Sequence, residues 1–281
     1  MNKELEVIAN IYIAFLETGT ASEIPVNLKP ASVVGTVQDD PFDCWVEATL
    51  KKVLPSNYQI FHAVKLTTPD LIIRDSLTNT IIGLEIKKLI QRVDGKDPRG
   101  LTIDYNSCLP CGSTMIKVGN DTVIVPCYYL FALLNPFSTS IVTLILMDGD
   151  FLNYDFNLHK EAKYSNYTEY NHGPYGEGSV RYRKMYTYPN PLNSKLDCFA
   201  KRQLMVLKKS LVSRSYLKGH TVGEIIRRDK FDNEFYYSLV DMSSRSNIQN
   251  CDCNIIRDIF HDCKSRVIKE RVAYIPEIPA L

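Results

Sequence analysis

The sequence predicts an α/β protein in which a mixed central β-sheet is flanked by helices and followed by a C-terminal elaboration. Near the amino terminus, apolar side chains recur at helical spacing, with Leu5, Ile8, Tyr12 and Phe15 on one stripe. From Tyr58 to Met147 the pattern changes to short segments rich in β-branched and aromatic residues, which is typical of strands. The composition, 45% hydrophobic and 23% charged, is that of an ordinary globular protein with a buried core.

A second helix is expected from Pro41 to Leu54, because two aspartates precede Pro41 as an acidic N-cap and Pro55 ends the pattern. Leu196 to Val212 and Val222 to Arg228 are interpreted as two further helices. The expected strands are Gln59 to Lys65, Leu71 to Arg74, Ile81 to Lys88, Leu101 to Tyr105, Thr122 to Val125, Ile141 to Met147 and Glu234 to Val240.

The net charge of +1 is unevenly distributed along the 281 residues. Residues 1–50 carry two Lys against eight Asp and Glu, whereas residues 195–230 carry ten Lys and Arg against three acids, so an anionic partner is expected at the basic end. No apolar run approaches the roughly 20 residues that a membrane helix needs, and no export signal is seen, so we expect a cytoplasmic protein without a membrane partner. In that reducing compartment the eight cysteines are thiols or metal ligands.

Two short segments carry the chemistry. Pro69-Asp70 opens one apolar strand, and Glu85-Ile86-Lys87 lies within the next. A hairpin that pairs Asp75 with Thr80 brings Asp70 opposite Glu85, and strand alternation places Lys87 on the same face as Glu85.

Directly opposed Cβ atoms lie about 4.5–5.5 Å apart, so the two carboxylates repel each other unless they share a cation. Oxygen ligands suit Mg²⁺, which takes one or two protein carboxylates and leaves room for a phosphate. Lys87 is then expected to act as a positive group toward water or phosphate. The alternative is a purely structural role, in which Asp70 caps a turn and Glu85 and Lys87 are neighbours on a solvated strand.

These segments resemble the PD-(D/E)xK nuclease superfamily, with Pro69-Asp70 and Glu85-Ile86-Lys87 as the matching residues. The resemblance covers only about 40 residues and implies catalytic roles for Asp70, Glu85 and Lys87, with Asp70 and Glu85 holding the metal. In that family a helix before the hairpin often adds an acidic residue, a part that Glu47 is placed to play.

The resemblance implies a restriction-endonuclease-like core at about residues 40–150 and an elaboration for recognition and dimerisation at about 151–281, within one domain. Such a type II restriction endonuclease cleaves double-stranded DNA with Mg²⁺ and acts as a homodimer on a short palindromic site. Two alternatives remain open: a structure- or damage-specific nuclease of the same fold, such as a repair nickase or junction resolvase, and a non-catalytic DNA-binding protein.

Candidate DNA contacts lie outside the motif. Arg181, Arg183 and Lys184 alternate with aromatic residues, and arginine suits bidentate reading of guanine. Basic side chains on the helix expected at Leu196 to Val212 are expected to neutralise phosphates. The candidates are Asn106, Ser107, Arg181, Arg183, Lys184, Lys201 and Lys208.

A zinc site is the last open possibility. Cys108 and Cys111 form one ligand pair, but Cys251, Cys253 and Cys263 do not form a standard second pair. The sequence leaves both the thiol and the zinc roles open for these five residues.

Overall fold

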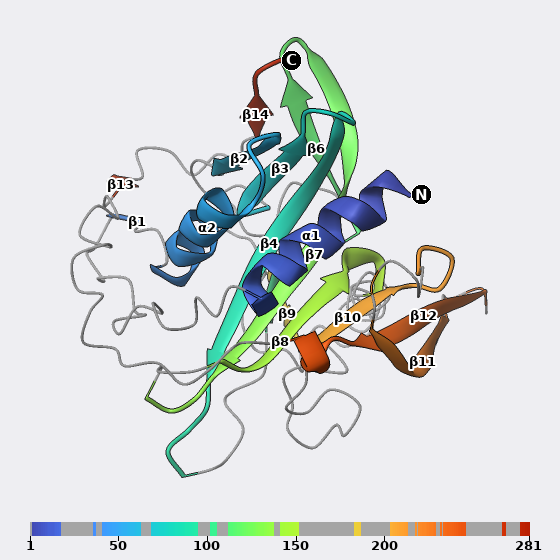
Figure 1. The fold of residues 1–281 in the computed structure, drawn as a ribbon. Coiled ribbons are helices and arrows are strands. Elements are labelled where there is room, and N and C mark those ends of the chain that lie inside the picture. Colours follow the sequence, from blue (N-terminus) through green and yellow to red (C-terminus); the bar gives the residue numbers. More distant parts are fainter. Residues whose placement is uncertain are drawn as a thin grey trace.

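A computed structural model describes residues 2–17, 36–37, 41–62, 69–94, 102–105, 112–137, 141–151, 183–186, 203–212, 217, 219–228, 231, 233–245, 266–267 and 276–281. Within this part the chain has an α/β fold built on one large, mixed and mostly antiparallel sheet with few helices (Figure 1). None of the described helices is both long enough and apolar enough to span a membrane.

The large sheet has ten strands, and eight of them follow the order β11-β12-β10-β8-β7-β4-β3-β2. The strand β4 is parallel to β7, and β8 is parallel to β10, while the other neighbours on this path are antiparallel. The strands on the path are β2 (Tyr58–His62), β3 (Leu71–Asp75), β4 (Thr80–Ile90), β7 (Asp121–Leu134), β8 (Ile141–Asp148), β10 (Gln203–Lys208), β11 (His220–Arg228) and β12 (Glu234–Asp241).

The remaining strands are short. β6 (Ser113–Val118) pairs with β7 and with β14 (Glu277–Ile278), which extends the large sheet. Two small ribbons are formed by β1 (Thr36–Val37) with β13 (Arg266–Val267), and by β5 (Thr102–Tyr105) with β9 (Arg183–Tyr186).

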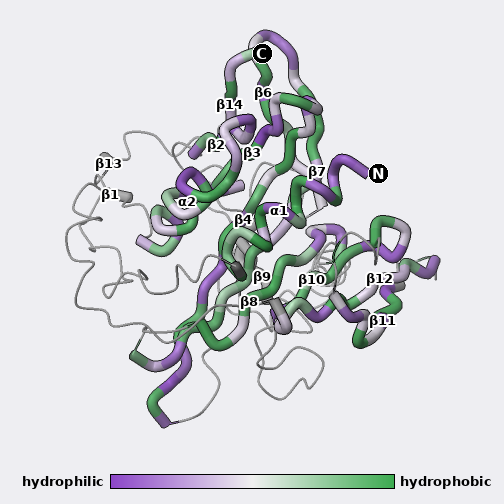
Figure 2. Tube along the Cα trace, viewed as in Figure 1, coloured by the Kyte–Doolittle hydropathy of each residue, from purple (hydrophilic) through white to green (hydrophobic). Residues whose placement is uncertain are grey.

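Both described α-helices pack on one face of the sheet, α1 (Lys3–Glu17) and α2 (Pro41–Val53). Their apolar side chains share a core with alternate residues of the strands, for example Leu84 of β4 and Leu130 of β7. The intervening residues of the central strands, including Phe131, form a second core on the opposite face. Figure 2 shows the resulting concentration of hydrophobic residues along the central strands.

Most of the predicted elements of the first 150 residues are confirmed within small shifts of their ends. The two later helices are wrong where the structure describes them, because Gln203–Lys208 is the strand β10 and His220–Arg228 is the strand β11. All four apolar residues from Leu204 to Leu207 are buried, so the run packs on both faces of an inner strand. Such a continuous apolar run cannot be distinguished from a helix by its period.

The predicted β3–β4 hairpin is confirmed in its register, with Asp75 opposite Thr80 and Leu71 opposite Leu84. The turn between the strands is tied by Asp75, whose carboxylate accepts hydrogen bonds from the Leu77 amide and the Thr78 hydroxyl. Asn79 has a φ of 52°, a left-handed conformation that asparagine adopts more readily than most residues. The turn therefore fixes which residues of β3 and β4 face each other.

The strand β14, which is distant in sequence, packs beside β3 and β6. Ile278 is buried beside Ile72 and Ile116, and the guanidinium of buried Arg74 donates a hydrogen bond of 2.7 Å to the Pro279 carbonyl. Arg74 also donates to the Gln59 side chain. The buried charge is therefore compensated by groups from β2 and from the C-terminal segment.

We expect Arg74→Met to destabilise the protein by about 2–4 kcal/mol, because the replacement removes the donors for the Gln59 and Pro279 oxygens. Urea unfolding at pH 7 measures this loss. Lys117→Met, at an exposed position of β6, is the matched control and should change the free energy of unfolding by less than about 0.5 kcal/mol. Similar values for both variants would contradict a special role for Arg74.

Candidate active site

The two acidic residues of the motif come together at the start of β3. The register places Leu71 opposite Leu84, so the next position along the hairpin brings Asp70 to Glu85. The Asp70 Oδ2 atom accepts a hydrogen bond of 2.7 Å from the Ile86 amide. The aspartate side chain thus continues the hairpin hydrogen bonding beyond the last paired residue of β3 and is held against β4.

Glu85 and Lys87 lie on one face of β4 and contact each other. Glu85 is 6% exposed, and the Lys87 ammonium donates a hydrogen bond to Glu85 Oε1. The adjacent Lys88 lies 5.8 Å from the centre of the Phe42 ring in α2. The two neighbouring lysines are therefore in different surroundings, in agreement with strand alternation.

The charge of Lys87 is set by its acidic neighbours. Burial disfavours the ammonium and lowers the pKa of Lys87, but the carboxylates of Glu85, Asp70 and Asp43 raise it, and the net shift is upward. Lys87 therefore remains protonated at neutral pH and can supply a positive charge and hydrogen-bond donors. It cannot act as a general base in this state.

The helix α2 presents an acidic residue that the sequence interpretation missed. Asp43 is close enough to Lys87 to raise its pKa. Glu47, the residue expected to join the site, instead accepts hydrogen bonds of 2.6 Å from Lys51 and pairs with His62 at 2.8 Å. Asp43 precedes Glu47 by four residues and shares its helix face, and that spacing is the signal that could have identified it.

Burial raises the pKa of Glu47, and the contacts with His62 and Lys51 lower it by more, so the net shift is downward. Glu47 is therefore an ionised carboxylate with two partners of its own.

The donor set suits a hard cation. Asp70 and Glu85 provide two carboxylates at one place, and Mg²⁺ commonly binds through one or two protein carboxylates and several waters. Among the described residues, no three His, Cys, Asp or Glu side chains form a group that could hold a metal ion. Asp70 and Glu85 are the described residues that would hold such an ion, with waters as its other ligands.

Four of the expected DNA contacts, Asn106, Ser107, Arg181 and Lys201, lie outside the described residues. Arg183 and Lys184 belong to β9 and pair with Tyr105 and Asp104 of β5. Residues Arg183–Tyr186 thus form one arm of a two-stranded ribbon.

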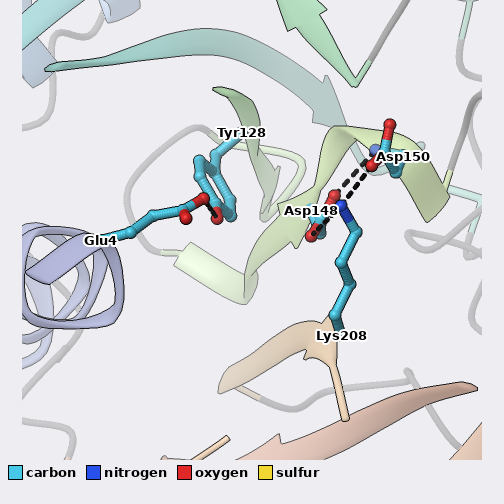
Figure 3. Close-up of polar contacts among 5 residues, drawn as sticks. All are labelled: Glu4, Tyr128, Asp148, Asp150 and Lys208. Atoms are coloured by element: carbon cyan, nitrogen blue, oxygen red, sulfur yellow. Dashed lines mark hydrogen bonds and ion pairs between the residues drawn. The ribbon is translucent and has the colours of Figure 1, made fainter. Parts of the chain in front are cut away.

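Lys208 lies at the end of β10, where it belongs to a polar cluster with Asp148 and Asp150 (Figure 3). Its ammonium forms an ion pair with Asp150 and lies 3.9 Å from Asp148 Oδ2. Burial lowers the pKa of Lys208, but the two aspartates raise it, and the net shift is upward. Lys208 was expected on a basic helix face that neutralises phosphates and is instead a strand residue paired with carboxylates.

Asp148 is the most buried acid of this cluster, at 4% exposure. It accepts a hydrogen bond of 2.8 Å from the Asp150 amide, and on the neighbouring strand the Tyr128 hydroxyl donates to Glu4 of α1. Burial raises the pKa of Asp148 to about 7, despite the opposing effect of Lys208. The cluster therefore contains a carboxyl group that changes charge near neutral pH.

The cysteines for which a zinc role was left open, Cys108, Cys111, Cys251, Cys253 and Cys263, all lie outside the described residues. The described thiols are Cys44, which is partly exposed, and Cys127, which is buried. Cys127 packs in the core on the second face of the sheet.

Comparison of the chain with protein-family models gives no match, and neither a curated protein nor a solved structure matches it. The interpretation of the site therefore depends on the chemistry of its residues.

We expect Asp148 to make stability fall with rising pH. An acid with a raised pKa in the folded state contributes stability that is fully present below its ordinary pKa of 3.8 and is lost as pH rises through about 7. Between pH 5.5 and pH 8 this loss should be about 1–2 kcal/mol, and Asp148→Asn should remove it.

Urea unfolding of both proteins at the two pH values measures the effect. Asp121→Asn, a replacement at an exposed carboxylate at the start of β7, is the control and should retain the wild-type slope. An equal loss of stability in Asp148→Asn would assign the pH dependence to another group.

Proposed function

We propose that this protein is a Mg²⁺-dependent endonuclease that hydrolyses phosphodiester bonds of double-stranded DNA. The single observation that carries the proposal is the β3–β4 register, which brings Asp70 to Glu85 and places Lys87 on the same face. Pro69-Asp70 and Glu85-Ile86-Lys87 resemble the motif of the PD-(D/E)xK nucleases. Two carboxylates and an ammonium close together agree with that resemblance. A solvated strand would not need Glu85 to be buried.

In this proposal Asp70 and Glu85 hold the metal, and the bound ion would polarise the phosphate and activate water. Lys87 supplies positive charge where negative charge develops on the phosphate in the transition state, or orients the attacking water. Its raised pKa favours this role over proton abstraction. Asp43 adds negative charge near Lys87 and helps to keep the ammonium protonated.

We further propose a restriction-endonuclease-like enzyme of the cytoplasm, in which a homodimer cuts both strands of a short palindromic site. The large sheet supports the single domain assumed in this proposal, since it includes strands of the 151–281 region, β10, β11 and β12, beside those of the motif. The ribbon of β5 and β9, which contains Arg183 and Lys184, is the proposed recognition element, since a two-stranded ribbon can enter a major groove. The runner-up is a structure- or damage-specific nuclease.

Incubation of the protein with unmethylated phage DNA and Mg²⁺, followed by sequencing of the fragment ends, separates these candidates. One recurrent sequence at the ends supports a restriction enzyme. Cuts confined to nicks, junctions or lesions support the runner-up, and intact DNA with retained binding supports a non-catalytic protein.

Replacing either metal-holding acid should abolish cleavage. We expect Asp70→Ala and Glu85→Ala each to reduce the cleavage rate by at least about 10³-fold, because each removes one of the two carboxylates that hold the cation. DNA affinity, measured separately by gel shift, should change little because neither residue neutralises a phosphate. Near-normal cleavage by both variants would refute the assignment.

The two neighbouring lysines provide an internal comparison. Lys87→Ala should lose on the order of 10²–10³ in cleavage rate, as is typical when a transition-state donor is removed. Lys88→Ala should lose less than about tenfold, because Lys88 contacts Phe42 instead of Glu85. Single-turnover cleavage at saturating protein measures both rates. Equal losses would show that activity does not depend on which face of β4 the lysine occupies.

A further inference from the structure

Gly83 lies on the same face of β4 as Glu85 and Lys87, two residues before Glu85. A Cβ atom at this position would lie 2.7 Å from Pro69 Cγ, 3.3 Å from Pro69 Cβ and 3.4 Å from Thr114 Cγ2. Real Cβ atoms essentially never approach another atom to less than 3.0 Å. The Pro69 ring therefore occupies the space that a side chain at position 83 would need.

Pro69 cannot easily move to make room for a Cβ atom at position 83. The residue is buried, and its ring is bonded to its own main-chain nitrogen, so the ring cannot rotate away as a free side chain would. The Cγ atom can shift with the ring pucker, but a displacement of the whole ring, including Cβ, is transmitted to the main chain that continues directly into Asp70. The Asp70 carboxylate, in turn, has a fixed partner in the Ile86 amide.

We propose that Gly83 is a positioning residue, whose lack of a side chain seats Pro69 on β4 and thereby places the Asp70 carboxylate beside Glu85. This proposal rests on the proposed function for its catalytic consequence, although the positioning itself is a structural statement about Pro69 and Asp70. It assigns a role to a residue of β4 that has no side chain with which to bind a metal.

The size of the displacement sets the expected effect. Restoring an ordinary contact of 3.4 Å from the 2.7 Å separation requires a shift of about 0.7 Å. Misplacing a catalytic group by about 1 Å costs on the order of 10² in rate. We therefore expect Gly83→Ala to lose about 10–100-fold in cleavage rate.

Gly223 provides a matched control within the same sheet. It lies in β11, and a Cβ atom added there would meet nothing within 4 Å. Gly223→Ala is thus the same chemical change in a strand without the contact. It should leave the cleavage rate and the position of Asp70 unchanged.

The experiment is a double-mutant cycle with Gly83→Ala, Pro69→Ala and the double variant, in which loss of the proline ring removes the Cγ atom. The first measurement is hydrogen exchange of the Ile86 amide in the Mg²⁺-free protein, which reports on Asp70 independently of cleavage. The second is single-turnover DNA cleavage over a range of Mg²⁺ concentrations. The amides of Ile82 and Leu84, within the paired part of β4, serve as internal references.

Gly83→Ala should lower the protection of the Ile86 amide at least tenfold relative to Ile82 and Leu84, and the double variant should recover at least half of that loss on a logarithmic scale. If Gly83→Ala alone does not fold, recovery of folding in the double variant supports the same contact. Unchanged Ile86 protection in Gly83→Ala, or no recovery in the double variant, overturns the positioning role.

The two proposals fail in distinguishable ways. If the wild-type protein does not cleave DNA, the proposed function fails while the exchange measurement still tests the positioning of Asp70. If the wild-type protein cleaves and Gly83→Ala cleaves equally well with unchanged Ile86 protection, the positioning role fails and the nuclease stands.

Discussion

The structure depends on the register between β3 and β4. A slip of one residue would exchange the two faces of β4. In the observed register Leu84 packs in the core beneath α1 and α2, while Glu85 lies beside Asp70 and Lys87. The slipped register would place both Glu85 and Lys87 under the helices, away from Asp70, and turn Leu84 out of the core. Burying charged groups in an apolar core is costly, so the hydrophobic core and the acidic pair enforce the same alignment.

Three cationic side chains of this sheet each have partners close by. Lys87 offsets the charge of Glu85, Arg74 is bound by Gln59 and the Pro279 carbonyl, and Lys208 pairs with Asp150. A buried ion pair is not by itself a source of stability, because desolvation offsets much of the attraction. The Lys87–Glu85 pair is therefore better explained by the positions it fixes than by the energy it adds.

The hairpin was predictable from the sequence because its determinants are local: a turn after Asp75, alternating side chains and a short span. The environment of Lys208 was not, since it depends on the parallel pairing of β10 with β8, which joins residues about 60 positions apart. The buried strand around Leu204 has a pattern that a helix can also have. Asp43 was overlooked because Glu47 satisfied the expected motif, although the two residues share one helix face. The contact of Pro69 with Gly83 has no signal in a single sequence.

The bond between Arg74 and the Pro279 carbonyl joins residues 205 positions apart. At a synthesis rate of 5–20 residues per second, the acceptor leaves the ribosome about 10–40 s after the donor. During that interval the nascent hairpin can form its turn, but the guanidinium has only part of its final set of acceptors and must remain hydrated. The region around β2, β3 and β6 is thus completed only after that interval, and until then it stays within reach of chaperones and proteases.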